Sequence, residues 1–485
     1  MADFVISTVS TTAQTLATFE HGIITTSGAL ITTASAAVTL AGASNLTVLG
    51  TIGQGFGGGL ITGAVTFPTI VVGGGGYIGN LDNTAISLTL SDILILENAG
   101  TIRGEISALS VTASDADAGV NLINSGRMAG RESVAVSVSL GTGRLNLFNS
   151  GEIAGTDGAV LVNSGSLRLT NTGTLADISE GLVIQLAGVA NDRIINTGSI
   201  FGSVDLGGGD DLFDNDGGGT MQGLIDFGAG NDELIGGAGR ERAMGGSGSD
   251  SMDFDAGRDI FLASNNDGQA SDGNDDIDGG DGIDSYDARN ISSRVVVNLN
   301  ESRANGDAIG LDHIFSFENI RGGGIGDILV GDTGRNVIRG GGGNDSIAGL
   351  GGDDRLIGND GNDTIRGGEG RDVMSGGDGI DTFAYYSITE IGSLNAFRDS
   401  ITDFVAGTDE INLSVIDANS IAVGNQAFSF IGIGAFTGVA GQLRYVASAL
   451  HQVTVVQGDI NGDSVADFQL ALFGNLTLAA GDFIL

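Results

Sequence analysis

The sequence predicts an all-β protein built from stacked repeats. In chain order we expect an N-terminal parallel β-helix or solenoid, a parallel β-roll, and a C-terminal cap of the β-sandwich or β-roll type. Three observations predict this fold class: 86 glycines with a single proline in 485 residues, a run of nonapeptides without insertions, and a longer Asn-x-Gly repeat near the N-terminus. Such periods indicate solenoids, in which each unit buries its apolar side by stacking on its neighbours.

The overall composition excludes two other glycine-rich classes. Collagen is excluded because the glycines follow no Gly-X-Y period, and ordinary disorder is disfavoured because 41% of the residues are hydrophobic. There is no cysteine, so neither disulfides nor thiolate metal sites are available. No stretch has the uninterrupted apolar length of a membrane span, and we expect no membrane insertion.

Residues 1–205 carry the Asn-x-Gly repeat, in which each Asn-x-Gly is followed by a short apolar stretch. It recurs at Asn98, Asn124, Asn149, Asn171 and Asn196, at spacings of 22 to 26 residues. Runs of alternating apolar and polar residues lie between these turns, such as VAVSVSL at 134–140, and this alternation is typical of half-buried strands. One coil of a parallel β-helix per repeat accounts for both features.

The segment 322–384 divides into seven consecutive nonapeptides without a slip in register. Position six is acidic or amide and position eight is apolar in every unit. Position six reads Asp327, Asn336, Asp345, Asp354, Asp363, Asp372 and Asp381, and position eight reads Leu329, Ile338, Ile347, Leu356, Ile365, Met374 and Phe383. A six-residue turn alternating with a three-residue strand predicts a coil of two nonapeptides, so position six recurs above itself every second unit at about 4.8 Å.

A looser block of the same repeat precedes it, at 206–287. Its units place Asp211, Asp232, Glu241, Asp250, Asp259, Asp275 and Asp284 in the acidic column. The intervening segment 288–321 has strand character without glycine turns, and we expect a peripheral hairpin or loop there. From 385 to 485 the strict repeat stops, which predicts a separate C-terminal domain.

The charge points to a bound cation. The 60 acidic residues are 47 Asp and 13 Glu, the 20 basic residues are all Arg, and the net charge is −40. Residues 1–205 account for −9 of this, leaving −31 for the remainder. A field of this sign opposes nucleic acid, so we expect no nucleic-acid partner. Unit charges one strand apart repel by about 3 kcal/mol at an effective dielectric near 20, and ions between the rungs would reverse that sign.

Calcium is the predicted cofactor, because Ca²⁺ takes 6 to 8 oxygen ligands and accepts main-chain carbonyls as well as carboxylates. Glycine turns can present such carbonyls, and side chains at positions one, two and four would obstruct the close approach and many of the dihedrals. The candidate metal-binding residues are Asp211, Asp232, Asp250, Asp259, Asp275, Asp284, Asp327, Gly340, Gly341, Gly343, Asp345, Asp354, Asp363, Gly367, Gly368, Gly370, Asp372, Gly376, Gly377, Gly379 and Asp381.

These nonapeptides resemble the RTX repeat, Gly-Gly-x-Gly-x-Asp-x-U-x, where U is apolar. The resemblance implies a parallel β-roll with Ca²⁺ held between successive turns and position eight facing inward. Four residues depart from the pattern and weaken particular rungs. Asn336 lacks the charge, Glu241 is one methylene longer than Asp, Ile325 replaces the fourth glycine, and Asp255 replaces the second.

Residues 382–485 resemble the C-terminal domain of serralysin-type metalloproteases through FRDSITDFVAGTDEINLS (397–414) and GDINGDSVADFQLAL (458–472), among other segments. The resemblance implies a type I secretion signal at the C-terminal residues 482–485, the type I secretion machinery of Gram-negative cells as a partner, and an extracellular or cell-surface location. No N-terminal signal peptide is expected. Asp459, Asn461, Asp463 and Asp467 have the spacing of a loop calcium site, and a polar turn is the equal alternative.

We predict no catalytic residues. The protease domain of that family is excluded, because its zinc motif needs three clustered histidines and His21, His313 and His451 are isolated. An RTX cytolysin is disfavoured, since there is no lysine to acylate. The favoured function is a secreted, calcium-folded protein with a structural or adhesive role, with a cell-surface glycan or self-association as the partner of residues 1–205. The alternative is a β-helical polysaccharide lyase or epimerase. The lack of a general base and of aromatic platforms in residues 1–205 argues against it, because we interpret His21 and Tyr77 as ordinary residues.

Overall fold

The computed structural model describes residues 4–17, 20–32, 36–54, 61–66, 68–264, 273–392 and 398–485. The regular secondary structure of the described chain is nearly all β-strand, which confirms the predicted fold class. Its internal contacts divide it into two units, residues 1–259 and 260–485. Each unit is described by itself.

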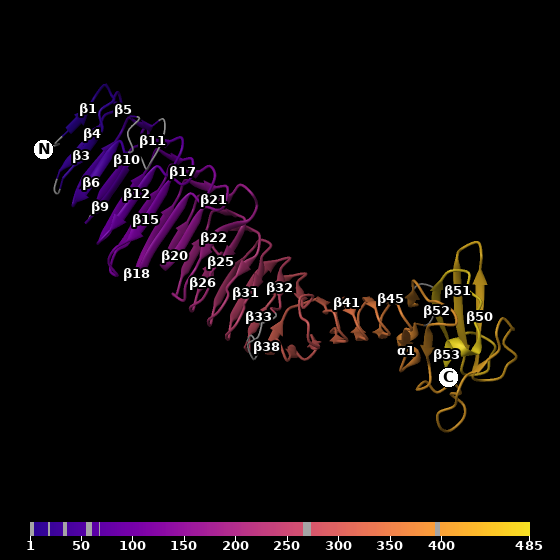
Figure 1. Ribbon diagram of the computed structural model, residues 1–485. Coiled ribbons are helices and arrows are strands. Elements are labelled where there is room, and N and C mark those ends of the chain that lie inside the picture. The colour runs from indigo at the N-terminus through magenta and orange to yellow at the C-terminus, as the bar shows by residue number, and fades with distance from the viewer. Residues whose placement is uncertain are drawn as a thin grey trace. The chain divides into compact units, whose positions relative to one another are not determined.

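Unit 1 is a parallel β-helix in which every complete coil contributes one strand to each of three columns (Figure 1). The first column contains β1 (Phe4–Ile6), β4 (His21–Ile24), β7 (Asn45–Val48), β10 (Thr69–Val72), β13 (Ile93–Asn98), β16 (Gly119–Asn124), β18 (Val136–Asn149), β20 (Val160–Asn171), β23 (Arg193–Asn196), β26 (Leu212–Asp214), β29 (Glu233–Gly237) and β31 (Ser251–Gly257). The second contains β3 (Gln14–Leu16), β6 (Val38–Gly42), β9 (Ile61–Val65), β12 (Ile86–Leu90), β15 (Leu109–Ala113), β22 (Leu182–Leu186), β25 (Ser203–Asp205), β28 (Ile225–Asp226) and β30 (Arg242–Met244). The long strands β18 and β20 run through both columns and join them into one sheet.

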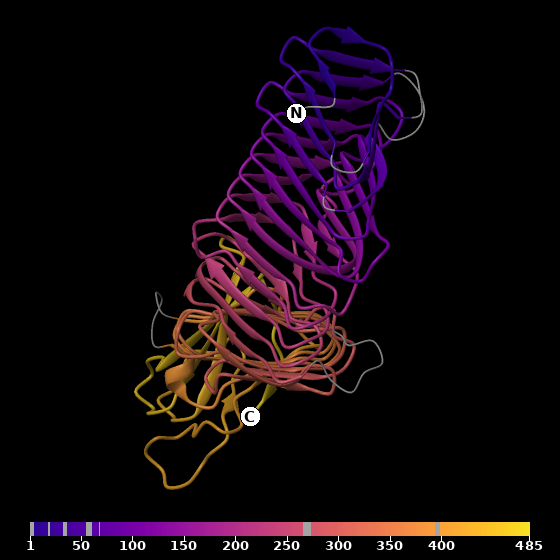
Figure 2. The same cartoon turned by 90° about the vertical axis from the view of Figure 1, so that its left-hand side faces the viewer.

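The third column is a separate sheet of ten strands, stacked along the indigo to magenta part of Figure 2. It contains β2 (Val9–Ser10), β5 (Ala29–Thr32), β8 (Thr51–Gln54), β11 (Tyr77–Asn80), β14 (Thr101–Gly104), β17 (Arg127–Gly130), β19 (Glu152–Gly155), β21 (Thr174–Asp177), β24 (Ser199–Phe201) and β27 (Thr220–Gln222). Its second position faces inward in coil after coil, as Ile52, Ile78, Ile102, Met128, Ile153, Leu175, Ile200 and Met221. Five of these residues, Ile102, Met128, Ile153, Leu175 and Ile200, belong to the short apolar stretches that follow the Asn-x-Gly turns.

The asparagines of the Asn-x-Gly repeat form a buried ladder at one corner of the helix. Each ends a strand of the first column, and each side-chain amide donates to the side-chain oxygen of the next, at 2.7 to 2.8 Å from Asn98 through Asn124, Asn149 and Asn171 to Asn196. All five are at most 2% exposed. An amide can accept from one neighbour while it donates to the other, so the ladder satisfies itself.

The third column ends at β27, and the coil then closes with two strands. From this point the register offset becomes 18 residues, as in the pairing of Glu233 with Ser251. The three-sided β-helix therefore becomes a two-sided roll within unit 1, at the first nonapeptides.

Unit 2 continues the two-sided architecture. One column contains β32 (Ile260–Leu262), β35 (Ser285–Asp287), β39 (Asn319–Arg321), β41 (Val337–Gly342), β43 (Arg355–Asp360), β45 (Val373–Asp378), β47 (Ser400–Ile401) and β52 (Phe468–Phe473). The other contains β36 (Val295–Asn298), β40 (Ile328–Val330), β42 (Ser346–Gly351), β44 (Thr364–Glu369), β46 (Thr382–Ala384), β48 (Glu410–Asn412) and β53 (Phe483–Ile484). Parallel partners lie 18 residues apart, as Ser346 and Thr364 do, which confirms the predicted coil of two nonapeptides. Position eight is buried from Leu329 to Phe383, as predicted.

The segment 288–321 is less peripheral than expected. It does form an antiparallel meander, of β36, β37 (Arg303–Gly306) and β38 (Gly310–Phe315). However, β36 pairs in parallel with β40, and β38 pairs in parallel with β33 (Asp276–Asp278), so both outer strands are part of the roll. A short strand, β34 (Asp281–Gly282), precedes the segment. Val295 and Val297 are fully buried, which is the physical reason for this integration.

The C-terminal part of unit 2 is built on the last coils of the roll. An antiparallel meander of β50 (Gln442–Ser448), β51 (Val453–Asp459) and β52 is joined to the roll by the β47–β52 pairing, and β49 (Ser429–Phe430) pairs with β50. Among the residues that the structure describes, the helical segments are the four-residue α1 (Ile388–Ile391) and the 3₁₀ turn Ala480–Asp482. Within the described ranges, no helix has the length and apolar character needed to cross a bilayer.

Candidate metal centres

The position-six carboxylates of unit 2 stand in two buried columns, as the register predicted. In one column the main-chain N–H of Asp327 donates to Asp345 Oδ1 (2.7 Å), that of Asp345 to Asp363 Oδ1 (2.8 Å), and that of Asp363 to Asp381 Oδ1 (2.9 Å). In the other, the N–H of Asn336 donates to Asp354 Oδ1 (2.8 Å), and that of Asp354 to Asp372 Oδ1 (2.9 Å). One oxygen of each carboxylate thus holds the preceding coil.

The other carboxylate oxygen points at the position-one glycine of its own nonapeptide. A Cβ on Gly340, Gly349, Gly358, Gly367 or Gly376 would lie only 2.0 to 2.1 Å from the Oδ2 atom of Asp345, Asp354, Asp363, Asp372 or Asp381, respectively. Among the described residues, these five Oδ2 atoms are buried and have no hydrogen-bond partner, and the same is true of Asp211 and Asp232. Position one is therefore glycine because the carboxylate occupies the space of a side chain.

Glycine at positions two and four has a different cause. Gly341, Gly368 and Gly377 at position two have φ between 104° and 116°, and Gly343, Gly370 and Gly379 at position four have φ between 89° and 151°. L-residues rarely adopt these values. Three residues that replace glycine at position two, Asp255, Leu350 and Asn359, keep a positive φ of 58°, 80° and 78°. The turn geometry is thus kept at these three positions although the residue is not glycine.

Burial raises the pKa of the column carboxylates far above their ordinary value of 3.8. The pKa of Asp345 and that of Asp354 rise to about 7, chiefly through desolvation and further through the neighbouring carboxylates, although a main-chain N–H opposes the rise. The pKa values of Asp372 and Asp381 rise to about 6 for the same first reason. A buried, desolvated carboxylate with other carboxylates as neighbours can only accept hydrogen bonds, and such a group is suited to binding a cation.

Unit 1 contains the same arrangement. Asp211 Oδ1 accepts from the N–H of Asp192 (2.7 Å), Asp232 Oδ1 from that of Asp211 (2.7 Å), and Asp250 Oδ1 from that of Asp232 (2.9 Å). Burial and adjacent carboxylates raise the pKa of Asp211 to about 8 and that of Asp232 to about 7. In the second column the N–H of Glu241 donates to Asp259 Oδ1 at 2.7 Å.

The amide ladder of the β-helix runs directly into this second column. Asn196 donates to Asn215 Oδ1 (2.7 Å), and Asn215 donates to Glu241 Oε1 (2.7 Å). The extra methylene of Glu241, which the sequence presented as a defect, lets its carboxylate reach the last amide. The helix corner thus changes from amides to carboxylates without a break.

Five acidic residues of the columns were not predicted. Asp192 precedes Asp211, and Asp399 and Asp409 follow Asp372 and Asp381, accepting from their N–H groups at 2.8 and 3.2 Å. Asp312 and Glu318 accept from the N–H of Asp275 (3.2 Å) and Asp284 (2.7 Å). Burial and the charge of Asp372 raise the pKa of Asp399 to about 9. Each of the five begins an acidic-x-Ile triplet, the part of the nonapeptide that the strand needs, without the glycine turn.

Two predicted positions differ from the rest. Asp327 Oδ1 accepts from Val295 of β36, and its Oδ2 accepts from Gly323, so both oxygens are engaged. Asn336 donates its amide to the Glu318 carbonyl and to Asp332 Oδ1, contacts that a carboxylate could not make. The column therefore accommodates the missing charge at Asn336 through local hydrogen bonds.

The loop at Asp459 is folded on itself. Asp459 accepts from the N–H groups of Gly462 (2.7 Å) and Ser464 (3.0 Å), and Asp467 accepts from Ile460 (2.7 Å) and from the Asn461 amide (3.1 Å). Asp463 Oδ1 accepts from Val465. These contacts favour the polar turn of the two alternatives. In the part of the chain that the structure describes, no three side chains of His, Asp or Glu converge as a metal cluster.

Comparison with known families identifies two regions of the chain. Residues 228–261 match the RTX calcium-binding nonapeptide repeat (4 copies), and residues 315–485 match the Peptidase M10 serralysin C terminal family. The protein thus carries calcium-binding RTX repeats followed by a serralysin-type C-terminal domain, and neither region is catalytic. No curated protein matched the sequence.

Solved structures gave partial likenesses. The AlgE6R2 subunit of the Azotobacter vinelandii mannuronan C5-epimerase is 27% identical over 32% of this chain and 91% of its own, with a TM-score of 0.25. The AlgE6R3 subunit of that enzyme is 29% identical over 33% and 78%, with a TM-score of 0.21. The extracellular lipase LipA of Serratia marcescens is 18% identical over 53% and 40%, also with a TM-score of 0.21. Scores this low support no inference about the activity of this chain.

Proposed function

We propose that this chain is a secreted protein whose roll folds when it binds calcium outside the cell, and whose N-terminal solenoid has a structural or adhesive role. The observation that carries the proposal is the row of buried Oδ2 atoms, each lacking a hydrogen-bond partner among the described residues and each lying at a glycine turn. In this proposal residues 206–287 and 322–384 are the two calcium-binding blocks, and the position-six aspartates with the glycines of their turns hold the ions.

Ionised carboxylates in this arrangement oppose folding unless cations compensate them. At neutral pH the unfolded chain ionises every Asp, whereas the folded columns hold Asp345 and Asp354 at pKa values of about 7. Folding without calcium must therefore either take up protons or bury charge, and both lower stability above pH 4. Ca²⁺ would bind the free Oδ2 atoms together with turn carbonyls, and its charge would reverse the repulsion.

The β-helix of unit 1 needs no such compensation at its Asn ladder. Each amide from Asn98 to Asn196 donates to the next one, and the apolar rows inside the coils are fully buried. Buried polar groups that are hydrogen-bonded carry little penalty. We therefore infer that these coils fold without calcium and that the roll is the calcium-dependent part.

The serralysin-type C-terminal domain supports export by a type I pathway. A chain that stays unfolded at low intracellular calcium and folds at the higher calcium outside would suit such export. Sensor and extracellular calcium modules bind with dissociation constants of about 10⁻⁷ to 10⁻³ M, so weak sites suffice outside the cell. The solenoid then becomes available at the cell surface or in a matrix.

Circular dichroism of the full chain tests the proposal. Titration of Ca²⁺ into EDTA-treated protein should give a cooperative gain of β signal, and Mg²⁺ at equal concentration should not, because Mg²⁺ requires a smaller octahedral site. The proposal fails if EDTA leaves the β signal unchanged, or if Mg²⁺ reproduces the effect. Incubation with acidic polysaccharides tests the enzyme alternative, since unsaturated or epimerised products would replace the adhesive role by catalysis.

A further inference from the structure

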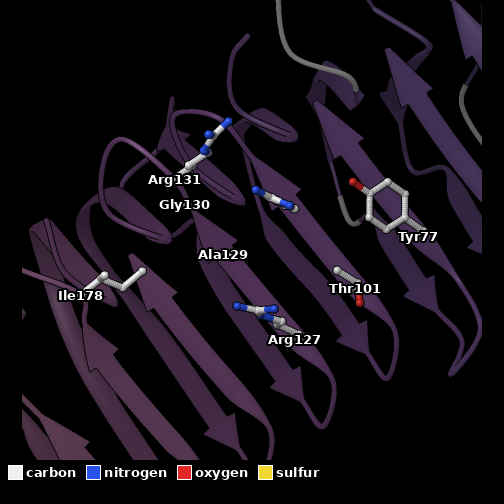
Figure 3. A pocket seen from close by; sticks show the side chains of 8 residues that line it. Tyr77, Thr101, Arg127, Ala129, Gly130, Arg131 and Ile178 are labelled. Atoms are coloured by element: carbon white, nitrogen blue, oxygen red, sulfur yellow. The ribbon is translucent and has the colours of Figure 1, made fainter. Parts of the chain in front are cut away.

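A cavity opens on the outer face of the third column of unit 1, away from the acidic columns. It has a volume of about 250 Å³ and is lined by Tyr77, Thr101, Arg103, Arg127, Arg131 and Ile178, with Ala129 and Gly130. Figure 3 shows Tyr77, Thr101 and Arg127 on successive strands, with Arg131 and Ile178 at the edge of the cavity. Three of the six arginines of residues 1–205, which are spread along the sequence, thus share one site in an acidic protein.

The ring of Tyr77 lies flat on the sheet. A Cβ added to Gly79 would be 2.3 Å from Tyr77 Cε1, 2.3 Å from its hydroxyl oxygen and 2.5 Å from Cζ, so the ring covers the backbone of Gly79. Gly79 is buried for this reason, although it belongs to the outward-facing row. The neighbour of Gly79 in the next coil is Arg103. Tyr77, which the sequence presented as an ordinary residue, thus offers an aromatic face in the cavity that Arg103 also lines, and glycine at position 79 leaves room for the ring.

The arginines keep donors available to a ligand. Arg127 pairs with Glu152 at 3.3 Å, and Arg131 Nη1 donates to Glu105 at 3.1 Å, both at the exposed surface. Exposed pairs contribute little, and a guanidinium has five N–H donors, so most of them stay open. Arg103 makes no ion pair with any described residue.

We propose that this cavity binds an acidic oligosaccharide, with one sugar ring stacked on Tyr77 and uronate carboxylates held by Arg103, Arg127 and Arg131. Planar guanidinium groups suit carboxylates, and the flat aromatic face suits the apolar face of a sugar ring. The volume accommodates one sugar ring, and neighbouring sugars extend along the sheet, where strands repeat at about 4.8 Å. The inference rests on the proposed adhesive role of the solenoid and assigns it a ligand class and residues.

Calorimetric titration of the full, calcium-loaded chain tests this site. The ligand is a hexasaccharide of alternating glucuronate and N-acetylglucosamine, and the same hexasaccharide with methyl-esterified carboxylates is the uncharged control. We expect the acid to bind and the ester to bind at least about tenfold more weakly, because charge-assisted hydrogen bonds are lost. Hexa-aspartate offers carboxylates, more of them than the hexasaccharide, without a sugar ring and should still bind more weakly.

Four variants separate the site from general effects. Arg103→Gln should weaken binding about tenfold. Gly79→Ala should displace the ring of Tyr77 and weaken binding about fivefold while leaving the tyrosine in place. Gly53, which pairs with Gly79 in the preceding coil, offers open space among the described atoms, so Gly53→Ala should change affinity less than about twofold. Arg168→Gln, in a strand outside the third column, should also change the affinity less than about twofold.

The outcomes are decisive in both directions. Absence of binding, equal binding of acid and ester, or equal effects of Gly79→Ala and Gly53→Ala would overturn the site. Equal binding of hexa-aspartate would replace the saccharide by an acidic peptide and overturn the proposal as stated. The calcium-dependent β signal is measured on the same samples, so a failure of this site is distinguishable from a failure of calcium-dependent folding.

Discussion

Asp354 offers the sharpest test of the buried columns, through the isosteric change Asp354→Asn. The carboxylate is 2% exposed, its Oδ1 accepts from the N–H of Asn336, and its Oδ2 lies at Gly349 without a hydrogen-bond partner among the described residues. An amide in its place can still accept from Asn336. The change therefore removes the charge and the free oxygen while it keeps the shape and the ladder hydrogen bond.

The structure gives the size of the effect. Raising the pKa of Asp354 from 3.8 to about 7 corresponds to about 4 kcal/mol that ionisation costs the ion-free fold. Asp354→Asn should therefore stabilise the ion-free roll at pH 8 by up to about 4 kcal/mol. In calcium the sign is opposite, because a charged ligand is lost, and the calcium midpoint should rise about tenfold.

Asp353 provides the matched control, because it precedes Asp354 and its side chain is exposed at the surface. Circular dichroism with calcium titration, and thermal unfolding in EDTA, should show opposite shifts for Asp354→Asn and nearly none for Asp353→Asn. Equal calcium midpoints for the two variants would refute the column as the calcium site. A lower stability of Asp354→Asn in EDTA would refute the electrostatic reasoning.

Three further predictions follow from the same structure. Because the pKa values of Asp345 and Asp372 are raised, the stability that these groups contribute without calcium is fully present below about pH 4 and is lost as pH rises through 6 to 7. Calcium binding at pH 6 should therefore release protons, which a pH electrode can measure. No proton release would contradict the raised pKa values. Gly358→Ala places a Cβ 2.0 Å from Asp363 Oδ2 and should lower the free energy of unfolding of the calcium-loaded chain by about 1 to 3 kcal/mol, measured by thermal melting. The control Gly324→Ala meets no described atom within 4 Å and should be neutral. Equal losses of stability in the two variants would refute the packing argument. Asn149→Ala breaks the buried ladder and should lower the free energy of unfolding in EDTA by about 2 to 5 kcal/mol. Asn146→Ala removes an exposed amide and should lower it only slightly. If the two variants melt at the same temperature, the ladder has no structural role.

The repeat architecture could be predicted from the sequence because the nine-residue period and the residue types at each position of the repeat indicate the same fold. A strict nine-residue period with an apolar position eight requires an 18-residue two-sided coil, and the pairing of Arg355 with Val373 has that offset. The Asn-x-Gly spacing likewise indicated one β-helix coil per repeat. The alternation of the position-six residues between two columns followed from the register of the nonapeptides alone.

Three features could not be predicted from the same pattern. The columns extend to Asp192, Asp399 and Asp409, whose units lack the glycine turn, so a search for whole nonapeptides misses them. The integration of β36 and β38 into the roll depends on long-range pairing that local pattern does not specify. The cavity at Tyr77 is lined by Arg103 and also by Arg127 and Arg131, which lie 24 and 28 residues later in the sequence. These arginines become neighbours only when the coils stack.

We propose that calcium folds the roll while the β-helix folds without it. Amide hydrogen exchange of the full chain, followed by mass spectrometry in EDTA and in calcium, tests this claim segment by segment. We expect strands from β12 to β24 to be protected in both conditions, and strands from β40 to β48 to gain protection only in calcium. Equal protection of β40 to β48 with and without calcium would contradict the claim.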